Sequence, residues 1–186
     1  MRAVATAVVA LLLITAVCAP WLAPYPSNQQ KLEDGLQSPS RAHLLGTDKL
    51  GRDTLARIIF GSRVSLQVGL ITVGVSLLLG LAIGSLAGVV GGWMDEILMR
   101  FVDLLMAFPG ALLVIAISAV LTPPSLGKLI FALSLVTWTG YARLVRGEIL
   151  SLREREFVDA GRALGASTWR LTTRHILPNI DRKSVV

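Results

Sequence analysis

Charge is scarce in this sequence, although an ordinary soluble domain needs it to cover its surface. Only 16% of the 186 residues are Asp, Glu, Lys or Arg, whereas 53% are hydrophobic. A typical soluble domain has about 25% charged residues. The few charges are clustered between long apolar stretches instead of being spread along the chain. The composition therefore argues against a soluble domain.

Cysteine and histidine are also scarce, and with them the groups that catalysis and metal binding require. Cys18 is the only cysteine, so it cannot form an internal disulfide, and we expect it to be a small buried hydrophobe. The two histidines, His43 and His175, fall on opposite sides of the membrane in the topology inferred below. A phosphate-binding Gly-x-x-x-x-Gly-Lys-Ser/Thr loop is missing. We expect no catalytic residue, no metal site and no cofactor site in this chain.

What the sequence has is four apolar stretches, each close to the roughly 20 residues that cross a bilayer as a helix. They cover about residues 4–22, 66–90, 97–121 and 126–145. The predicted fold class is an all-α polytopic membrane protein. Its predicted parts are a first transmembrane helix in residues 1–24, an extracytoplasmic loop in 25–64 and a transmembrane domain in 65–186. A cleaved signal peptide is the alternative for the first stretch, but Pro20 directly after the candidate cleavage site disfavours it.

The net charge of +6 indicates the orientation of these stretches. Arginine is concentrated at the end of the fourth stretch and after it, at Arg143, Arg146, Arg153, Arg155, Arg162, Arg170 and Arg174. Because segments rich in Lys and Arg stay in the cytoplasm, the C-terminal region is predicted to be cytoplasmic. Four crossings place the N-terminus there too, although basic residues between the first two stretches weaken the inference. Positive charge also suits nucleic acid, but orientation explains it more economically, and we expect no nucleic acid partner.

Local patterns predict helix boundaries and packing. Asp53 is a candidate N-cap, and Gly61 a candidate stop, for a short amphipathic helix within the loop of residues 25–64. The second apolar stretch carries glycines at four-residue spacing, which allows another helix to approach one face closely; these are Gly80, Gly84, Gly88 and Gly92.

The third apolar stretch contains the candidate residues of a translocation path, Asp103 and Pro109. Arg100 and Asp103 lie one turn apart, which predicts either an interfacial ion pair or a polar group that faces a substrate path. Pro109 should kink or interrupt the helix, because proline lacks a backbone N–H and clashes with the preceding turn.

Residues 154–178 predict a cytoplasmic helix–turn–helix. An amphipathic helix over residues 154–164 precedes the turn Gly165-Ala166-Ser167, and Pro178 follows a second short helix. A DNA-binding helix–turn–helix has a similar pattern, but it needs a third helix to form its own core.

Within this segment, Asp159-Ala160-Gly161 is followed after three residues by Gly165 and after nine more by His175-Ile176-Leu177-Pro178. The pattern resembles the EAA loop of binding-protein-dependent ABC importer permeases, which reads Glu-Ala-Ala, three residues, Gly, nine residues, Ile-x-Leu-Pro. The spacing is intact, and Asp159 and Gly161 keep the charge sign and small size of the residues they replace.

A second set of motifs narrows the resemblance to the dipeptide, oligopeptide and nickel importer permeases. The resemblance runs from about residue 19 to about residue 180, and its motifs include His43-Leu44-Leu45-Gly46-Thr47-Asp48, Gly91-Gly92-Trp93-Met94-Asp95, Ala107-Phe108-Pro109, Tyr141-Ala142-Arg143 and Arg146-Gly147-Glu148.

This resemblance implies a permease subunit of the bacterial or archaeal inner membrane that moves solutes by alternating access. It implies a homologous second permease, cytoplasmic ATPase subunits that bind ATP and Mg²⁺, and an extracytoplasmic substrate-binding protein. This subunit itself is then not an enzyme. The residues expected to couple it to the ATPase are Phe157, Asp159, Ala160, Gly161, Arg162, Gly165 and Pro178.

The sequence departs from the family pattern at its C-terminal end. Such permeases have two further spans after the EAA loop, so four of an expected six transmembrane helices are predicted here and the chain is expected to be truncated. Residues 181–186 do not resemble the apolar start of a fifth span and are expected to be a non-native tail. A secondary transporter or channel subunit is the alternative function, but those proteins often show internal repeats, and none is evident here.

Overall fold

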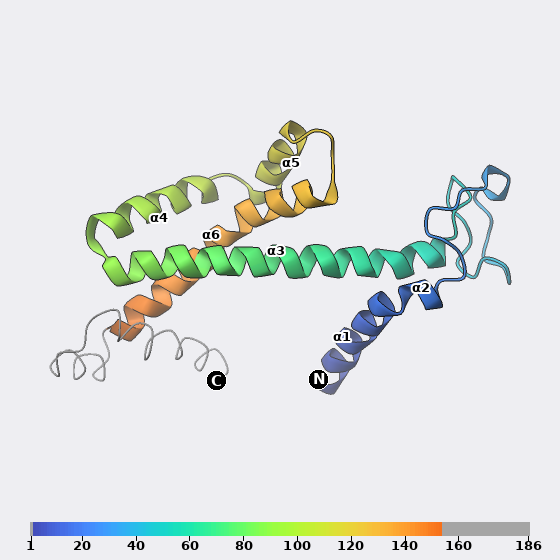
Figure 1. Cartoon of the computed structure of the whole chain (residues 1–186), viewed down its shortest axis with the longest axis horizontal. Coiled ribbons are helices and arrows are strands. Elements are labelled where there is room, and N and C mark those ends of the chain that lie inside the picture. The colour runs from blue at the N-terminus through green and yellow to red at the C-terminus, as the bar shows by residue number, and fades with distance from the viewer. Residues whose placement is uncertain (1, 154–186) are drawn as a thin grey trace. The chain divides into compact units, whose positions relative to one another are not determined.

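The computed structural model describes residues 2–153, and the predicted coupling segment and tail lie outside them. The elements are α1 (Arg2–Val17), α2 (Ala19–Leu22), the 3₁₀ turn η1 (Leu32–Asp34), α3 (Thr54–Val90), α4 (Gly92–Met106), α5 (Gly110–Val120) and α6 (Leu126–Arg153) (Figure 1). Residues 2–153 contain no strand, so the prediction of an all-α chain is confirmed for them. Two compact units, residues 1–70 and 71–186, are described in turn.

The helices differ in how well they suit a membrane span. Among the described helices, α3 is long and apolar enough to cross a membrane alone, and α4 with α5 qualifies as one span broken by a bend of 85°. The apolar helix α1 is shorter than a usual span, with 16 residues. The count of four spans therefore stays a prediction.

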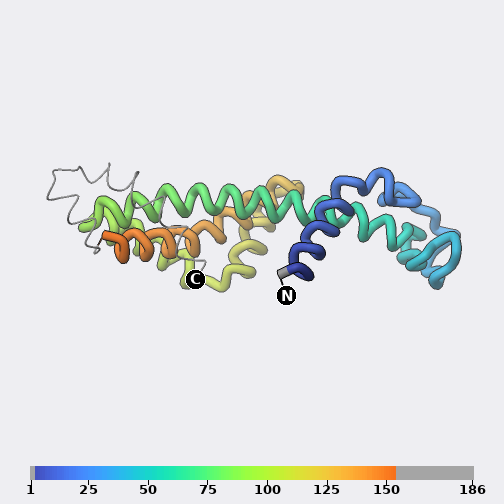
Figure 2. Tube along the Cα trace, turned by 90° about the horizontal axis from the view of Figure 1, so that it is seen from below, coloured from blue at the N-terminus to red at the C-terminus, as the bar shows by residue number. Residues whose placement is uncertain are grey.

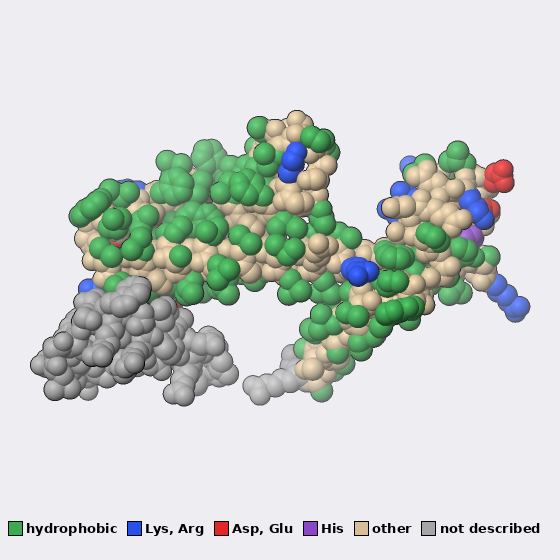
Figure 3. Space-filling view, viewed as in Figure 1, with side chains coloured by type: hydrophobic (Ala, Val, Ile, Leu, Met, Phe, Trp, Pro, Cys, Tyr) green, Lys and Arg blue, Asp and Glu red, His purple; other side chains and the backbone are tan. Residues whose placement is uncertain are grey.

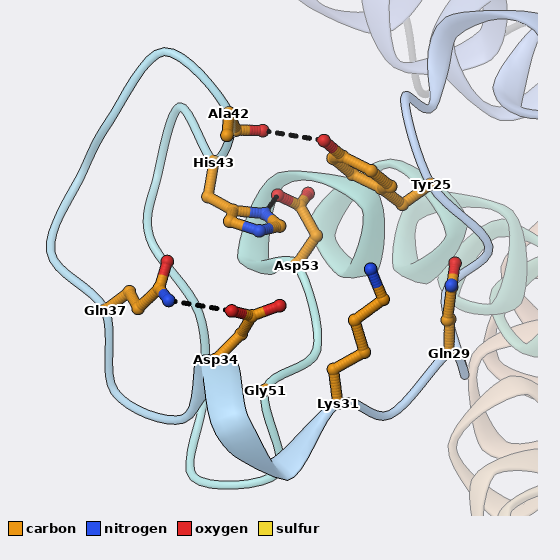
Figure 4. Close-up of a pocket in the computed structure, with 9 residues that line it drawn as sticks. All are labelled: Tyr25, Gln29, Lys31, Asp34, Gln37, Ala42, His43, Gly51 and Asp53. Atoms are coloured by element: carbon orange, nitrogen blue, oxygen red, sulfur yellow. Dashed lines mark hydrogen bonds and ion pairs between the residues drawn. The ribbon is translucent and has the colours of Figure 1, made fainter.

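In the first unit, the loop between α2 and α3 is organised around two carboxylates. Asp53 is the predicted N-cap of α3, and its Oδ1 accepts a hydrogen bond of 2.7 Å from the Ala56 N–H. Its other oxygen lies 2.9 Å from Nδ1 of His43, whose ring packs against Tyr25 (Figure 4). Asp48 accepts hydrogen bonds from the side chains of Arg52 and Arg57 at 2.8 and 2.6 Å. These bonds fix the turn that leads into α3.

The helix predicted to stop at Gly61 does not stop there. Instead α3 runs without interruption from Thr54 to Val90, so the short amphipathic helix and the second apolar stretch are one helix. A glycine in a helix costs about 1 kcal/mol relative to alanine. That cost is too small to end this helix, because no proline follows and a long apolar stretch begins at Leu66.

In the second unit, α6 crosses α3 at the predicted glycines, and Figures 1 and 2 both show the two helices side by side there. A Cβ on Gly88 would lie 2.9 Å from Cγ2 of Ile149, and one on Gly84 would meet the Ala142 carbonyl oxygen. A Cβ on Gly80 would meet Cβ of Tyr141. The prediction of close packing is confirmed at these three positions.

Gly92, the fourth glycine of the series, does not pack against another helix. Gly92 has no atom within 4 Å of an added Cβ, and both Gly91 and Gly92 have positive φ, at 67° and 59°. Side chains with a Cβ rarely adopt this conformation. The prediction that Gly92 packs against a helix is therefore wrong, because it forms the turn from α3 into α4.

Large apolar side chains remain exposed on this unit. Leu78 of α3 and Leu112 of α5 expose 68% and 62% of their surface, and Figure 3 shows hydrophobic side chains over the visible faces of α3, α4 and α5. A soluble monomer rarely exposes contiguous apolar area of this extent. The surface suits contact with lipid or with another apolar subunit.

We expect Gly84→Leu to destabilise the second unit, because the new side chain would overlap the Ala142 backbone. Overpacking of this kind costs about 1–3 kcal/mol or more. The melting temperature of the detergent-solubilised chain should fall clearly. Gly74→Leu is the matched control, since nothing lies within 4 Å of a Cβ there. Equal melting temperatures for the two variants would contradict the observed crossing.

We also expect acid to weaken the loop through Asp48. The hydrogen bond from the Arg52 side chain, with those from the backbone N–H groups of Arg52 and Leu50, holds the pKa of Asp48 well below its usual range. A carboxyl whose pKa is lowered by folding stabilises the fold above its unfolded pKa of about 3.9, and this contribution is lost as the pH falls through the folded pKa.

Asp48→Asn should therefore lower the melting temperature by equal amounts at pH 7 and pH 5, and by less at pH 3. Glu33→Gln, in the same loop, is the control and should change little at any of these values, since the Glu33 side chain is exposed. A difference between wild type and Asp48→Asn that stays constant down to pH 3 would show that Asp48 does not carry this pH dependence.

Candidate functional site

The break between α4 and α5 falls where the sequence places Pro109. The helix α4 ends at Met106, α5 begins at Gly110, and the two axes differ by 85°. Pro109 occupies the N-cap position of α5, and its carbonyl oxygen accepts the Leu113 N–H at 3.1 Å. The predicted interruption is confirmed. Its cause is the one expected for proline, which cannot donate the backbone hydrogen bond that would continue α4.

Asp103 forms an ion pair with Arg143 of α6. The Arg100 partner expected from the sequence is wrong: Arg100 lies 4.0 Å from Glu96 on its own helix, and both of these side chains are largely exposed. One turn of spacing made Arg100 and Asp103 neighbours, but Asp103 points across to α6 instead. Pairs between two helices depend on how the helices cross, which the local pattern does not contain.

A second ion pair joins the same two helices one turn further along α6. Arg146 contacts Asp95 with two nitrogens, Nε to Oδ1 at 2.5 Å and Nη2 to Oδ2 at 2.7 Å. The side chains are 31% and 15% exposed, so this pair is more sheltered than that of Asp103 and Arg143. Bidentate pairs between arginine and a carboxylate are among the strongest hydrogen-bonded contacts of side chains.

A packed apolar contact joins α4 with α6 beside these pairs. Val102, Trp138 and Ala142 are buried together, and Ile83 of α3 and Met99 of α4 pack against them. Phe101 stacks on Trp138 with ring centroids 6.4 Å apart. The three helices thus share one small core.

A polar hollow of about 240 Å³ opens beside this core. It is lined by Gly92, Asp95, Glu96, Met99, Arg100, Asp103 and Arg146. Asp103, one of the two predicted path residues, therefore lines a charged hollow, whereas Pro109 lies at the bend and not in the lining. The mixture of both charge signs suits water and polar solutes better than lipid.

A second hollow, of about 280 Å³, lies in the loop of the first unit. Figure 4 shows its lining side chains, which include Tyr25, Lys31, Asp34, His43 and Asp53. The His43–Asp53 pair holds the loop closed on the start of α3. Among residues 2–153, no three His, Cys, Asp or Glu side chains lie close enough together to hold a metal ion.

The residues predicted to couple to an ATPase lie outside the described part of the chain. They are Phe157, Asp159, Ala160, Gly161, Arg162, Gly165 and Pro178. Their role stays a prediction. The structure describes α6 as far as Arg153, directly before the segment of residues 154–178 that contains them.

Sequence reasoning missed the pairing of Asp95 with Arg146 and of Asp103 with Arg143. The available signal was that acids recur on the α4 segment and arginines on the α6 segment, both inside apolar surroundings. Unpaired charges there are costly, so partners were to be expected.

Comparisons with known proteins agree with the motifs. The family model described as binding-protein-dependent transport system inner membrane component matches residues 80–183, and that of the N-terminal TM domain of oligopeptide transport permease C matches residues 2–39.

Similar curated proteins come from several bacteria. A glutathione transport system permease protein of Pectobacterium atrosepticum is 42% identical over 99% of this chain and 62% of its own length. In Bacillus subtilis, a dipeptide and an oligopeptide transport system permease protein are each 40% identical, over 90% and 92% of this chain and 52% and 56% of their own lengths. The chain thus spans somewhat more than half the length of these relatives.

The predicted resemblance is confirmed, because the first family model covers more than half of the chain, including α4, α5 and α6. The chain belongs to the family of binding-protein-dependent transport system inner membrane components.

Proposed function

We propose that this chain is the permease subunit of an ATP-driven importer of small peptides in the cytoplasmic membrane. The observation that carries the proposal is the family match over residues 80–183, together with relatives that are named for dipeptide, oligopeptide and glutathione transport. The exposed apolar faces of α3 and α5 and the broken span at Pro109 support it.

The proposal includes partners that supply what this chain lacks. A homologous second permease completes the pore, cytoplasmic ATPase subunits bind ATP and Mg²⁺, and an extracytoplasmic binding protein delivers the substrate. The chain contains no phosphate-binding loop in its sequence, so ATP hydrolysis belongs to the separate subunits. In this scheme the chain is not itself an enzyme and carries no cofactor.

In this mechanism, α6 connects the membrane part to the coupling segment. Residue 154 directly follows α6, so a displacement of residues 154–178 by the ATPase reaches the α3–α4–α6 core through one continuous helix. The core then alternates between states open to either side, which is a rigid-body type of switch. The N-terminus and the coupling segment lie in the cytoplasm in the proposed topology.

Peptide is the proposed substrate because the relatives above are named for peptides. Nickel is the alternative substrate. Residues 2–39 match a family domain named as transmembrane, which favours a retained first helix over a cleaved signal peptide. A secondary transporter or channel would work without ATP, so energy dependence separates these functions.

Uptake of a labelled dipeptide tests the function. Proteoliposomes that contain this chain with its partner permease, ATPase subunits and binding protein should import the dipeptide only when ATP is supplied. An ion gradient without ATP should give no uptake, and labelled nickel should not be imported. Uptake driven by the gradient alone would favour a secondary transporter instead.

Gly165→Trp tests the coupling segment. A bulky side chain at the predicted turn should block docking of the ATPase, with a loss of about 2 kcal/mol or more, as at other interface hot spots. ATPase co-purified with the chain should fall sharply, while membrane insertion stays normal. Gly69→Trp is the control, since nothing lies within 4 Å of a Cβ at that position. Unchanged co-purification of the ATPase with Gly165→Trp would contradict the assigned role.

A further inference from the structure

Arginines on the last three turns of α6 hold the neighbouring helices at three points. Arg143 and Arg146 pair with Asp103 and Asp95 of α4, as described above. Arg153 reaches α3, where its Nη1 donates a hydrogen bond of 2.7 Å to the Gly88 carbonyl oxygen and lies 3.4 Å from that of Val89. All three contacts lie within the second unit, just before the predicted coupling segment.

Arg153 binds carbonyl groups at the C-terminal end of α3. The last four carbonyls of a helix have no partner within it, and they carry a partial negative charge that favours a cation. Gly88 lies in this last turn, and its missing side chain lets α6 approach closely enough for Arg153 to reach the carbonyl. The bond therefore ties the end of α6 to the corner between α3 and α4.

The contact between Arg146 and Asp95 fixes the start of α4. Asp95 lies in the first turn of α4, where the positive end of the helix dipole favours a carboxylate. Both of its oxygens are used by the planar guanidinium, so the pair sets direction as well as distance. A lysine at position 146 would keep the charge but could not form the two parallel bonds.

These contacts add charged links to the packing of α4 on α6. The helix α4 is bound to α6 by two ion pairs and by the Trp138 cluster, whereas the chain changes direction by 85° at residues 107–109. A force that enters at the end of α6 must therefore carry α4 along before it can move the two helices apart. The helix α5 packs against α6 as well, so the contacts with α6 link both halves of the broken span to it.

We propose that Asp95 and Arg146, together with Arg153, are positioning residues that make α4 move with α6 when the coupling segment moves. The inference rests on the proposed function, because it assigns the contacts a role in coupling ATP hydrolysis to transport. It concerns residues outside the predicted coupling segment of residues 154–178. Hydrophobic packing around Trp138 already holds the helices together, so these charges act on the direction of motion.

The number of peptides imported per ATP hydrolysed tests the proposal. Asp95→Asn and Arg146→Lys should hydrolyse ATP at rates near that of the wild type but import about tenfold less peptide per ATP, a change within the usual range of coupling between sites. The peptide concentration at half-maximal import should stay unchanged. The exchange Asp95→Arg with Arg146→Asp should restore at least half of the coupling.

Glu96→Gln is the matched control. Glu96 is the next residue along α4 and undergoes the same loss of charge, but its contact with Arg100 is within one helix and largely exposed. It should change import per ATP by less than about twofold, as weak surface pairs do. Equal import per ATP for wild type and Asp95→Asn would overturn the proposal. Parallel loss of ATPase activity, import and protein yield would also overturn it, since that pattern means a structural role only.

Cross-linking tests the contact between α4 and α6 without measuring transport. In a Cys18→Ser background, Met99→Cys with Ala142→Cys should be joined by a short bifunctional thiol reagent equally well without nucleotide and in the ATP-trapped state. Adding Asp95→Asn should make the yield depend on the nucleotide. A wild-type yield that changes between the two states would show that α4 slides on α6, and the proposal would be wrong. Failure of peptide import by the unmodified transporter refutes only the proposed function.

Discussion

The close approach of α6 to α3 is the contact on which the rest of the second unit depends. Helices in lipid gain little from burying apolar surface against one another, since lipid tails are equally apolar, so packing must come from small residues that let backbones touch. Gly80, Gly84 and Gly88 provide this contact, and the Ser76 hydroxyl adds a long hydrogen bond of 3.4 Å to the Ser134 carbonyl. Only at this separation can Arg153 reach the end of α3 and Trp138 reach the core shared with α4.

The ion pairs within residues 71–153 all involve α4, and physical cost explains why they gather there. A charge at the centre of a bilayer is expensive, whereas one near the interface can reach water or a partner. Asp95, Asp103, Arg143 and Arg146 surround or border a polar hollow, and the exposed apolar side chains lie along α3 and α5 instead. The unit thus combines an apolar outer surface with a polar end that can be hydrated.

The sequence predicted features that depend on local chemistry and failed on those that depend on how helices cross. The cap at Asp53, the break at Pro109 and the packing of Gly84 follow from the residue itself or from its spacing along one helix. The partners of Asp103 and Asp95 lie 40 and 51 residues away, and no local spacing encodes them. The end of the helix at Gly61 was wrong because one glycine weakens a helix without ending it. The coupling residues from Phe157 to Pro178 still rest on their motif alone.

Helix packing and ion pairs contribute differently to a protein that must change shape. Contacts such as those of Gly84 and Trp138 are short-ranged and fill space, so they resist separation of the helices but give little resistance to small rotations. A bidentate pair adds a preferred direction, because two parallel hydrogen bonds are lost together when either helix turns. Stability alone would not require this, since apolar residues can replace ion pairs of similar burial at little cost. One bidentate pair and one further ion pair between α4 and α6 therefore suit a unit that has to transmit rotation from one helix to the next.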